Sequence, residues 1–129
     1  MLLTGLLAAC GGSDDADNSA GQTRPAPPVA MPRQPELPTG FPSPSEVTYT
    51  EERMIGPSQI VKGYWEGDIE SAFEGYKEAF DGTDYSVTKE EREEVDAEVN
   101  FSGEGVAGQV KLLESCKDRT DVSITVRPS

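Results

Sequence analysis

The chain has 129 residues, a length typical of a single domain. Only 35% of the residues are hydrophobic, while 13 are glycine and 10 are proline. The formal net charge is −13 at pH 7, from 24 acidic and 11 basic side chains. Because phosphate backbones repel a body of this charge, the composition argues against a nucleic-acid-binding protein.

The first ten residues form an apolar segment that ends at a cysteine. Leu7-Ala8-Ala9-Cys10 resembles the lipobox of bacterial lipoproteins, in which a branched aliphatic residue and two small residues precede the cysteine. In that family the cysteine thiol receives a diacylglyceryl group, and the peptide is cleaved before the cysteine. The resemblance implies lipidation at Cys10 and a membrane partner. It places the protein on the cell membrane or the outer membrane, with its folded part outside the cytoplasm.

Residues 1–9 are interpreted as the end of a signal peptide, because a transmembrane helix needs about 20 apolar residues. A signal peptide normally opens with lysine or arginine, and no basic residue precedes Cys10. We therefore expect the true start of the protein to lie upstream of Met1.

Residues 10–45 are predicted to form the lipidated cysteine and a disordered linker. The segment is rich first in glycine and aspartate and then in proline, and it holds few large apolar residues. Such a segment buries too little surface to offset its ordering entropy, so it should act as a spacer. The remaining residues, 46–129, are predicted to fold as one small domain.

The clearest element of this domain is a helix beginning after Asp68, which suits the N-cap position. Gly82 is expected to end the helix in the left-handed conformation, and Gly75 is its weak point. Strands are predicted before the helix at Val47–Thr50 and Ser58–Trp65, with a turn at Gly56-Pro57 between them. The helix has one apolar face, with helical spacing, made of Ile69, Ala72, Phe73, Tyr76 and Phe80.

After the helix the apolar period changes to two. Alternation is clearest over 95–101 and continues beyond a hairpin turn at 102–105 and a second turn at 117–119. Short turns between such strands favour an antiparallel meander with one solvated face, and the helix covers the other face. The fold class is therefore α+β: four to six antiparallel strands, mostly in a C-terminal meander, with one packed helix.

The sequence offers no catalytic constellation. It has no histidine, so a Cys–His nucleophile is excluded. The charge run 89–94, with Asp96 and Glu98 after it, lacks the spacing of a calcium loop and is interpreted as a solvated loop and sheet edge. We expect neither an enzyme nor a bound metal or cofactor.

Three other residues attract attention. If Cys10 carries lipid, Cys116 has no partner in the same chain, and burial near a strand end is the commonest state of such a cysteine. If Cys10 is not acylated, a Cys10–Cys116 disulfide has to be considered. Tyr64 and Trp65 are candidate partner contacts if they are exposed, and core residues if they are buried.

Two functional hypotheses remain. The first is a non-catalytic envelope lipoprotein whose domain binds or spaces another envelope protein. The second is a small-ligand-binding or accessory subunit with a pocket between the helix and the sheet. A cavity lined by Phe73 and Tyr76 would favour the second hypothesis.

Overall fold

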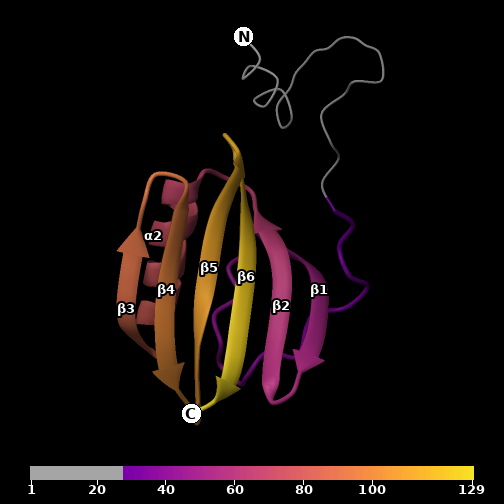
Figure 1. Ribbon diagram of the computed structural model, residues 1–129, viewed down its shortest axis with the longest axis vertical. Coiled ribbons are helices and arrows are strands. Elements are labelled where there is room, and N and C mark those ends of the chain that lie inside the picture. The colour runs from indigo at the N-terminus through magenta and orange to yellow at the C-terminus, as the bar shows by residue number, and fades with distance from the viewer. Residues whose placement is uncertain (1–27) are drawn as a thin grey trace.

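The computed structural model describes residues 28–129, which form one antiparallel sheet and one helix packed against it. The sheet has the strand order β1-β2-β6-β5-β4-β3, and the helix lies behind its β3–β4 side in Figure 1. The expected α+β class is thus confirmed, at the upper limit of the expected strand number. The elements are β1 (Val47–Ile55), β2 (Ser58–Trp65), α2 (Ile69–Asp81), β3 (Ser86–Arg92), β4 (Asp96–Gly103), β5 (Val106–Cys116) and β6 (Arg119–Pro128).

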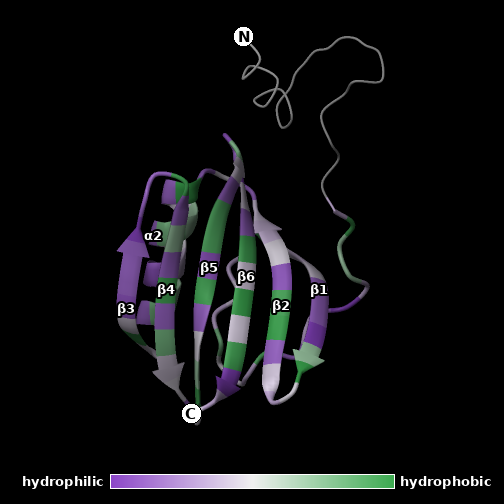
Figure 2. Ribbon diagram, viewed as in Figure 1, coloured by the Kyte–Doolittle hydropathy of each residue, from purple (hydrophilic) through white to green (hydrophobic). Residues whose placement is uncertain are grey.

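The topology combines a hairpin and a meander. Strands β3 to β6 follow one another across the sheet, and β6 then pairs with β2 of the N-terminal hairpin. Helix α2 connects β2 to β3 and contacts strands β3 to β6. The alternation of green and purple along the strands in Figure 2 is the period-two pattern that the sequence shows.

Most apolar side chains of the sheet turn toward the helix side, and Leu113 of β5 is an exception on the other face. Val61, Val99, Val110 and Ile124 are fully buried on the helix side, as is the apolar face of α2. Gly108 lies opposite Phe101 in the β4–β5 register, and a Cβ at Gly108 would come within 2.8 Å of the Phe101 ring. The glycine therefore leaves room for a large ring in the core.

Helix α2 begins as predicted but ends differently. The Asp68 carboxylate accepts a hydrogen bond from the Ser71 backbone N–H at 2.9 Å, which confirms the N-cap. Gly82 has a φ of −91°, so the predicted left-handed exit is wrong. The last turn is instead closed by Thr83, because its N–H and its hydroxyl both donate to the Phe80 carbonyl, at 3.0 and 2.7 Å.

Residues 28–45 correct the predicted domain boundary, because they pack on the sheet rather than lead up to it. Phe41 is buried, and its ring makes edge contacts with Phe80, Tyr85 and Phe101 at centroid distances of 5.5, 5.7 and 5.2 Å. The Tyr85 hydroxyl donates to the Thr39 carbonyl at 2.8 Å. A few large side chains are enough to hold this proline-rich segment on the sheet. Proline restricts the unfolded chain, so less conformational entropy is lost when the segment becomes ordered.

Both edge strands depart from regular pairing. In β1 the register shifts between Tyr49 and Glu51, and in β3 it shifts between Val87 and Lys89. Each shift is a β-bulge, which adds twist at that point of the edge. The charge run was expected to form a loop and an edge. Its first four residues, Lys89–Arg92, are the end of edge strand β3, and its last two, Glu93 and Glu94, lie in the connection to β4.

Candidate functional site

Tyr64 and Trp65 lie side by side in the sequence but on opposite faces of the sheet, because successive strand residues alternate. Trp65 is 4% exposed and belongs to the core, where its indole N–H donates to the Ser71 hydroxyl at 3.1 Å. Tyr64 lies on the other face, and the Arg119 guanidinium sits 5.8 Å from the centre of its ring. Both rings are buried, so neither is the exposed partner contact that the sequence suggested.

The packing of Trp65 explains the glycine inside the helix. A Cβ at Gly75 would lie 2.3 Å from Cη2 of the Trp65 ring. The residue that looked like a weak point of the helix is thus the position where the indole reaches the helix backbone. Sequence reasoning missed this role, since it needs the strand and the helix to be placed together.

The face of the sheet away from the helix has an unusual charge. Residues 28–129 carry 21 acidic and 10 basic side chains, once Asp14, Asp15, Asp17 and Arg24 are set aside. Six of the bases but only five of the acids project from the strands on this open face, so its net charge is +1 while the described range carries −11. These residues are Arg53, Lys62, Lys89, Lys111, Arg119 and Arg127 against Glu51, Glu91, Asp96, Glu98 and Asp121.

A groove of about 650 Å³ crosses the middle of this open face. Its floor includes Leu113 of β5, whose side chain is half exposed, and Pro28 stands at its rim. Leu113 pairs with Asp121 on β6 and with Asp96 on β4. The leucine therefore lies between two aspartates in a row that crosses the three strands. The sequence places Asp96 on the solvent face but cannot place these three residues together, because that depends on the register in which β4, β5 and β6 pair.

A second groove, of about 490 Å³, lies at the end of the sheet that the helix does not cover. The proline-rich segment forms one wall, since the Gln59 amide donates to the Glu36 carbonyl at 2.8 Å and to the Glu52 carboxylate at 2.9 Å. The apolar part of its lining includes Met54, which is 62% exposed. Neither of these two grooves lies between Phe73, Tyr76 and the sheet, where a ligand pocket was considered.

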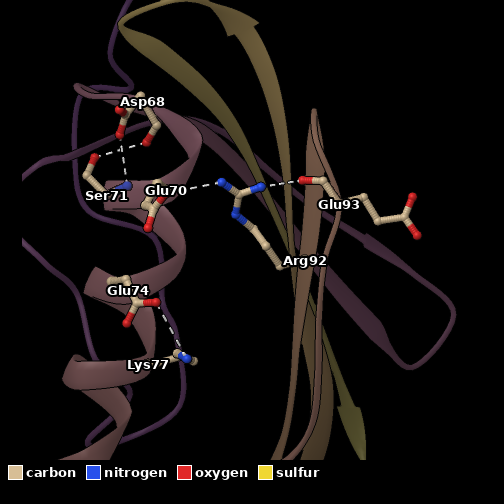
Figure 3. A network of polar contacts seen from close by, with 7 residues as sticks. All are labelled: Asp68, Glu70, Ser71, Glu74, Lys77, Arg92 and Glu93. Carbon is tan, nitrogen blue, oxygen red and sulfur yellow. Dashed lines mark hydrogen bonds and ion pairs between the residues drawn. The ribbon is translucent and has the colours of Figure 1, made fainter.

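A polar network joins helix α2 to edge strand β3 (Figure 3). Arg92 reaches the Glu70 carboxylate at 3.3 Å, and Lys77 lies 3.0 Å from Glu90 and 3.7 Å from Glu74. The hydrogen bond to Glu90 raises the pKa of Lys77. Hydrogen bonds from Ser71 lower the pKa of Asp68. Both groups therefore hold their charges firmly around neutral pH, which suits a helix cap at Asp68 and a helix-to-strand contact at Lys77, and not proton transfer.

The part of the chain that the structure describes contains no group of three or more metal-ligating side chains. Within residues 28–129 there is likewise no helix of the length and apolarity that crossing a bilayer requires.

Cys116 ends strand β5 and is buried, as expected for a cysteine near a strand end. It is disulfide-bonded and not a free thiol, which is one of the states that the sequence leaves open. Cys10, the chain's other cysteine and the predicted lipidation site, lies outside the described residues.

Tyr76 presents a buried hydroxyl whose oxygen has no hydrogen-bond partner among residues 28–129. The side chain is fully buried, and this burial raises its pKa well above the ordinary value. An unpaired buried hydroxyl costs about 1–3 kcal/mol in desolvation. We expect Tyr76→Phe to raise the free energy of unfolding by about 1 kcal/mol, measured by urea denaturation.

Tyr85→Phe is the matched control for this change. It also removes one tyrosine hydroxyl from the core, but that hydroxyl donates to the Thr39 carbonyl. Its loss should therefore lower the free energy of unfolding by about 1 kcal/mol. A fall for both variants would show that the Tyr76 hydroxyl has a partner, such as an internal water.

Comparison with protein-family models, with curated proteins and with solved structures gives no significant match. The function therefore has to be argued from the residues and the geometry.

Proposed function

We propose that this protein is a bacterial envelope lipoprotein, anchored to a membrane through acylated Cys10, whose domain is a non-catalytic binding or spacing module. The observation that carries the proposal is the run Leu7-Ala8-Ala9-Cys10, which is followed at once by a polar Gly-Gly-Ser-Asp-Asp segment. Two or more acyl chains hold a protein firmly on a bilayer, whereas one chain does so only marginally.

The packing of residues 28–45 alters the length of the proposed spacer. The backbone N–H of Met31 donates to the Tyr49 carbonyl at 2.9 Å, so the folded unit begins by about that residue. Some 20 residues then separate it from Cys10, and a random coil of that length spans about 25 Å. The domain would stand close to its membrane, within reach of components seated on the same surface.

A binding or spacing role suits the surface better than a small-ligand role. Phe73 and Tyr76, which would have lined a pocket between helix and sheet, are packed in the core. The nearly neutral open face is the part of an acidic molecule that another acidic envelope protein can approach with least repulsion. The partner we propose is such a protein.

Acylation and a disulfide exclude each other at Cys10, because one sulfur cannot carry a diacylglyceryl thioether and a disulfide bond at once. Stable disulfides belong to oxidising compartments, which in bacteria lie outside the cytoplasm. A disulfide at Cys116 and a lipid at Cys10 therefore agree on the compartment, although they compete for the same sulfur if Cys10 is the partner.

The test is fatty-acid labelling of the full gene product in its own host, with membrane fractionation. We expect label and membrane association in the unaltered protein and their loss in Cys10→Ala. Cys116→Ala is the matched control and should keep both. A soluble, unlabelled protein whose two cysteines are linked on a non-reducing gel would overturn the proposal.

A further inference from the structure

The floor of the open-face groove carries two cross-strand rows of opposite charge. In the row described above, two aspartates flank Leu113, which is 50% exposed. In the neighbouring row, Ser123 of β6 pairs with Lys62 on β2 and with Lys111 on β5, so a serine lies between two lysines. The groove therefore has an acidic side with an apolar centre and a basic side with a hydroxyl at its centre.

Charges of both signs in this groove lack an ion-pair partner within residues 28–129. They are those of Asp96, Asp121 and Lys62. Lys111 lies 4.0 Å from Glu98, and its side chain is still 57% exposed. Glu51, the remaining charged residue of the lining, lies 3.7 Å from Arg53. An occupant with charge of one sign would be repelled by one of the two rows, so the groove suits an occupant that carries both signs.

The spacing of the two rows matches that of an extended peptide. Asp121 and Ser123 are two residues apart on β6, a distance of about 7 Å. In an extended segment the side chains of residues i and i+2 point to the same face and lie equally far apart. A segment along β6 can thus place a basic side chain over the acidic row, with its apolar stem on Leu113. An acidic side chain two residues away then lies between Lys62 and Lys111, within reach of the serine hydroxyl.

We propose that the open-face groove binds an extended segment of the partner protein in which a basic and an acidic residue stand two positions apart. The inference rests on the proposed function and deepens it, because it names the part of the envelope protein that the open face contacts. The contacts are made by side chains, so the segment can run in either direction along β6. The spacing is fixed, because side chains one or three positions apart point to opposite faces.

The test is an NMR titration of the ¹⁵N-labelled full chain with two blocked peptides of identical composition and net charge. In acetyl-Gly-Arg-Thr-Glu-Gly-amide the two charges are two positions apart, and in acetyl-Gly-Arg-Glu-Thr-Gly-amide they are adjacent. We expect the first peptide to shift the amide signals of Leu113, Asp121 and Ser123, with a dissociation constant on the order of 1 mM. The second should bind about fivefold more weakly, the equivalent of one exposed ion pair. Equal binding of the two peptides, or no binding of either, would overturn the proposal.

Variants of the groove show whether both rows take part. Asp121→Asn and Lys62→Gln should each weaken binding of the first peptide about fivefold. Lys89→Gln is the matched control, because Lys89 projects from the same face but does not line the groove, and it should leave binding unchanged. An equal effect of all three variants would contradict a site at the two rows.

The remaining outcomes separate this inference from its alternatives. If the groove signals shifted on dilution of the chain without peptide, a second copy would be the occupant and the proposal would fail. Failure of the fatty-acid labelling would remove the membrane anchor and leave the peptide titration unaffected. Failure of the titration would remove this contact and leave the labelling unaffected.

Discussion

Replacing Phe41 with alanine should lower the free energy of unfolding by about 3–5 kcal/mol, the usual cost of removing a buried phenylalanine ring. The ring is 8% exposed and makes edge contacts with three other aromatic rings of the core. A domain of this size is stabilised by only about 5–15 kcal/mol, so the loss should take away a large share of the total. Urea denaturation, with the midpoint and slope compared to those of the unaltered protein, measures it.

Val29→Ala is the matched control, because Val29 belongs to the same proline-rich segment but is 86% exposed. Its effect should stay within about 0.5 kcal/mol. If Phe41→Ala were as mild as Val29→Ala, residues 28–45 would be a linker after all. A large difference between the two would show that the folded unit includes this segment.

Replacing Gly75 with alanine should destabilise the protein by about 2 kcal/mol, although alanine is the better helix former. The helix would gain up to about 1 kcal/mol from the change. That gain is outweighed because the new Cβ would lie 2.3 Å from the Trp65 ring. The ring cannot easily move away, since its N–H is bonded to Ser71 and its neighbour Tyr76 is fully buried. Trp65 is the only tryptophan, so its fluorescence emission reports the unfolding of the protein. In Gly75→Ala the emission should shift at a lower urea concentration than in the unaltered protein.

Gly82→Ala provides the comparison at the end of the same helix. A Cβ at Gly82 meets nothing within 4 Å, and its φ of −91° is accessible to alanine. This change should stabilise the protein by about 0.4–1 kcal/mol, because alanine lowers the conformational entropy of the unfolded chain. Stabilisation by both substitutions would contradict the packing of Trp65 against the helix backbone.

Local signals in the sequence predict most of the elements. The apolar spacing of the helix, its aspartate cap and the strict alternation after residue 95 correspond to α2, β4 and the strands that follow. The glycines at 102–105 predict the hairpin turn between β4 and β5. In the structure Glu104 and Gly105 both have positive φ, as a tight two-residue turn requires. These features depend on neighbours in the sequence, so no knowledge of the overall arrangement is needed.

Features that depend on distant residues are not predicted. The proline-rich segment looks like a linker because its few large side chains are widely spaced, and only the assembled sheet gives Phe41 a place to bind. The insertion of β6 between β2 and β5 is a matter of topology. The row of Asp121, Leu113 and Asp96 depends on the registers in which β4, β5 and β6 pair. The roles of Gly75 and of the candidate site could therefore be found only in the structure.

The two bulges bear on how copies of this protein behave when they are crowded. A straight edge strand offers a row of unpaired backbone groups to which a neighbouring chain can add its own strand. Here β1 is bulged beyond Tyr49 and receives the Met31 N–H, while β3 is bulged beyond Val87 and ends in four consecutive charged residues. Both rims of the sheet are poor templates for such addition. Many copies confined to one surface could thus lie close together and remain separate molecules.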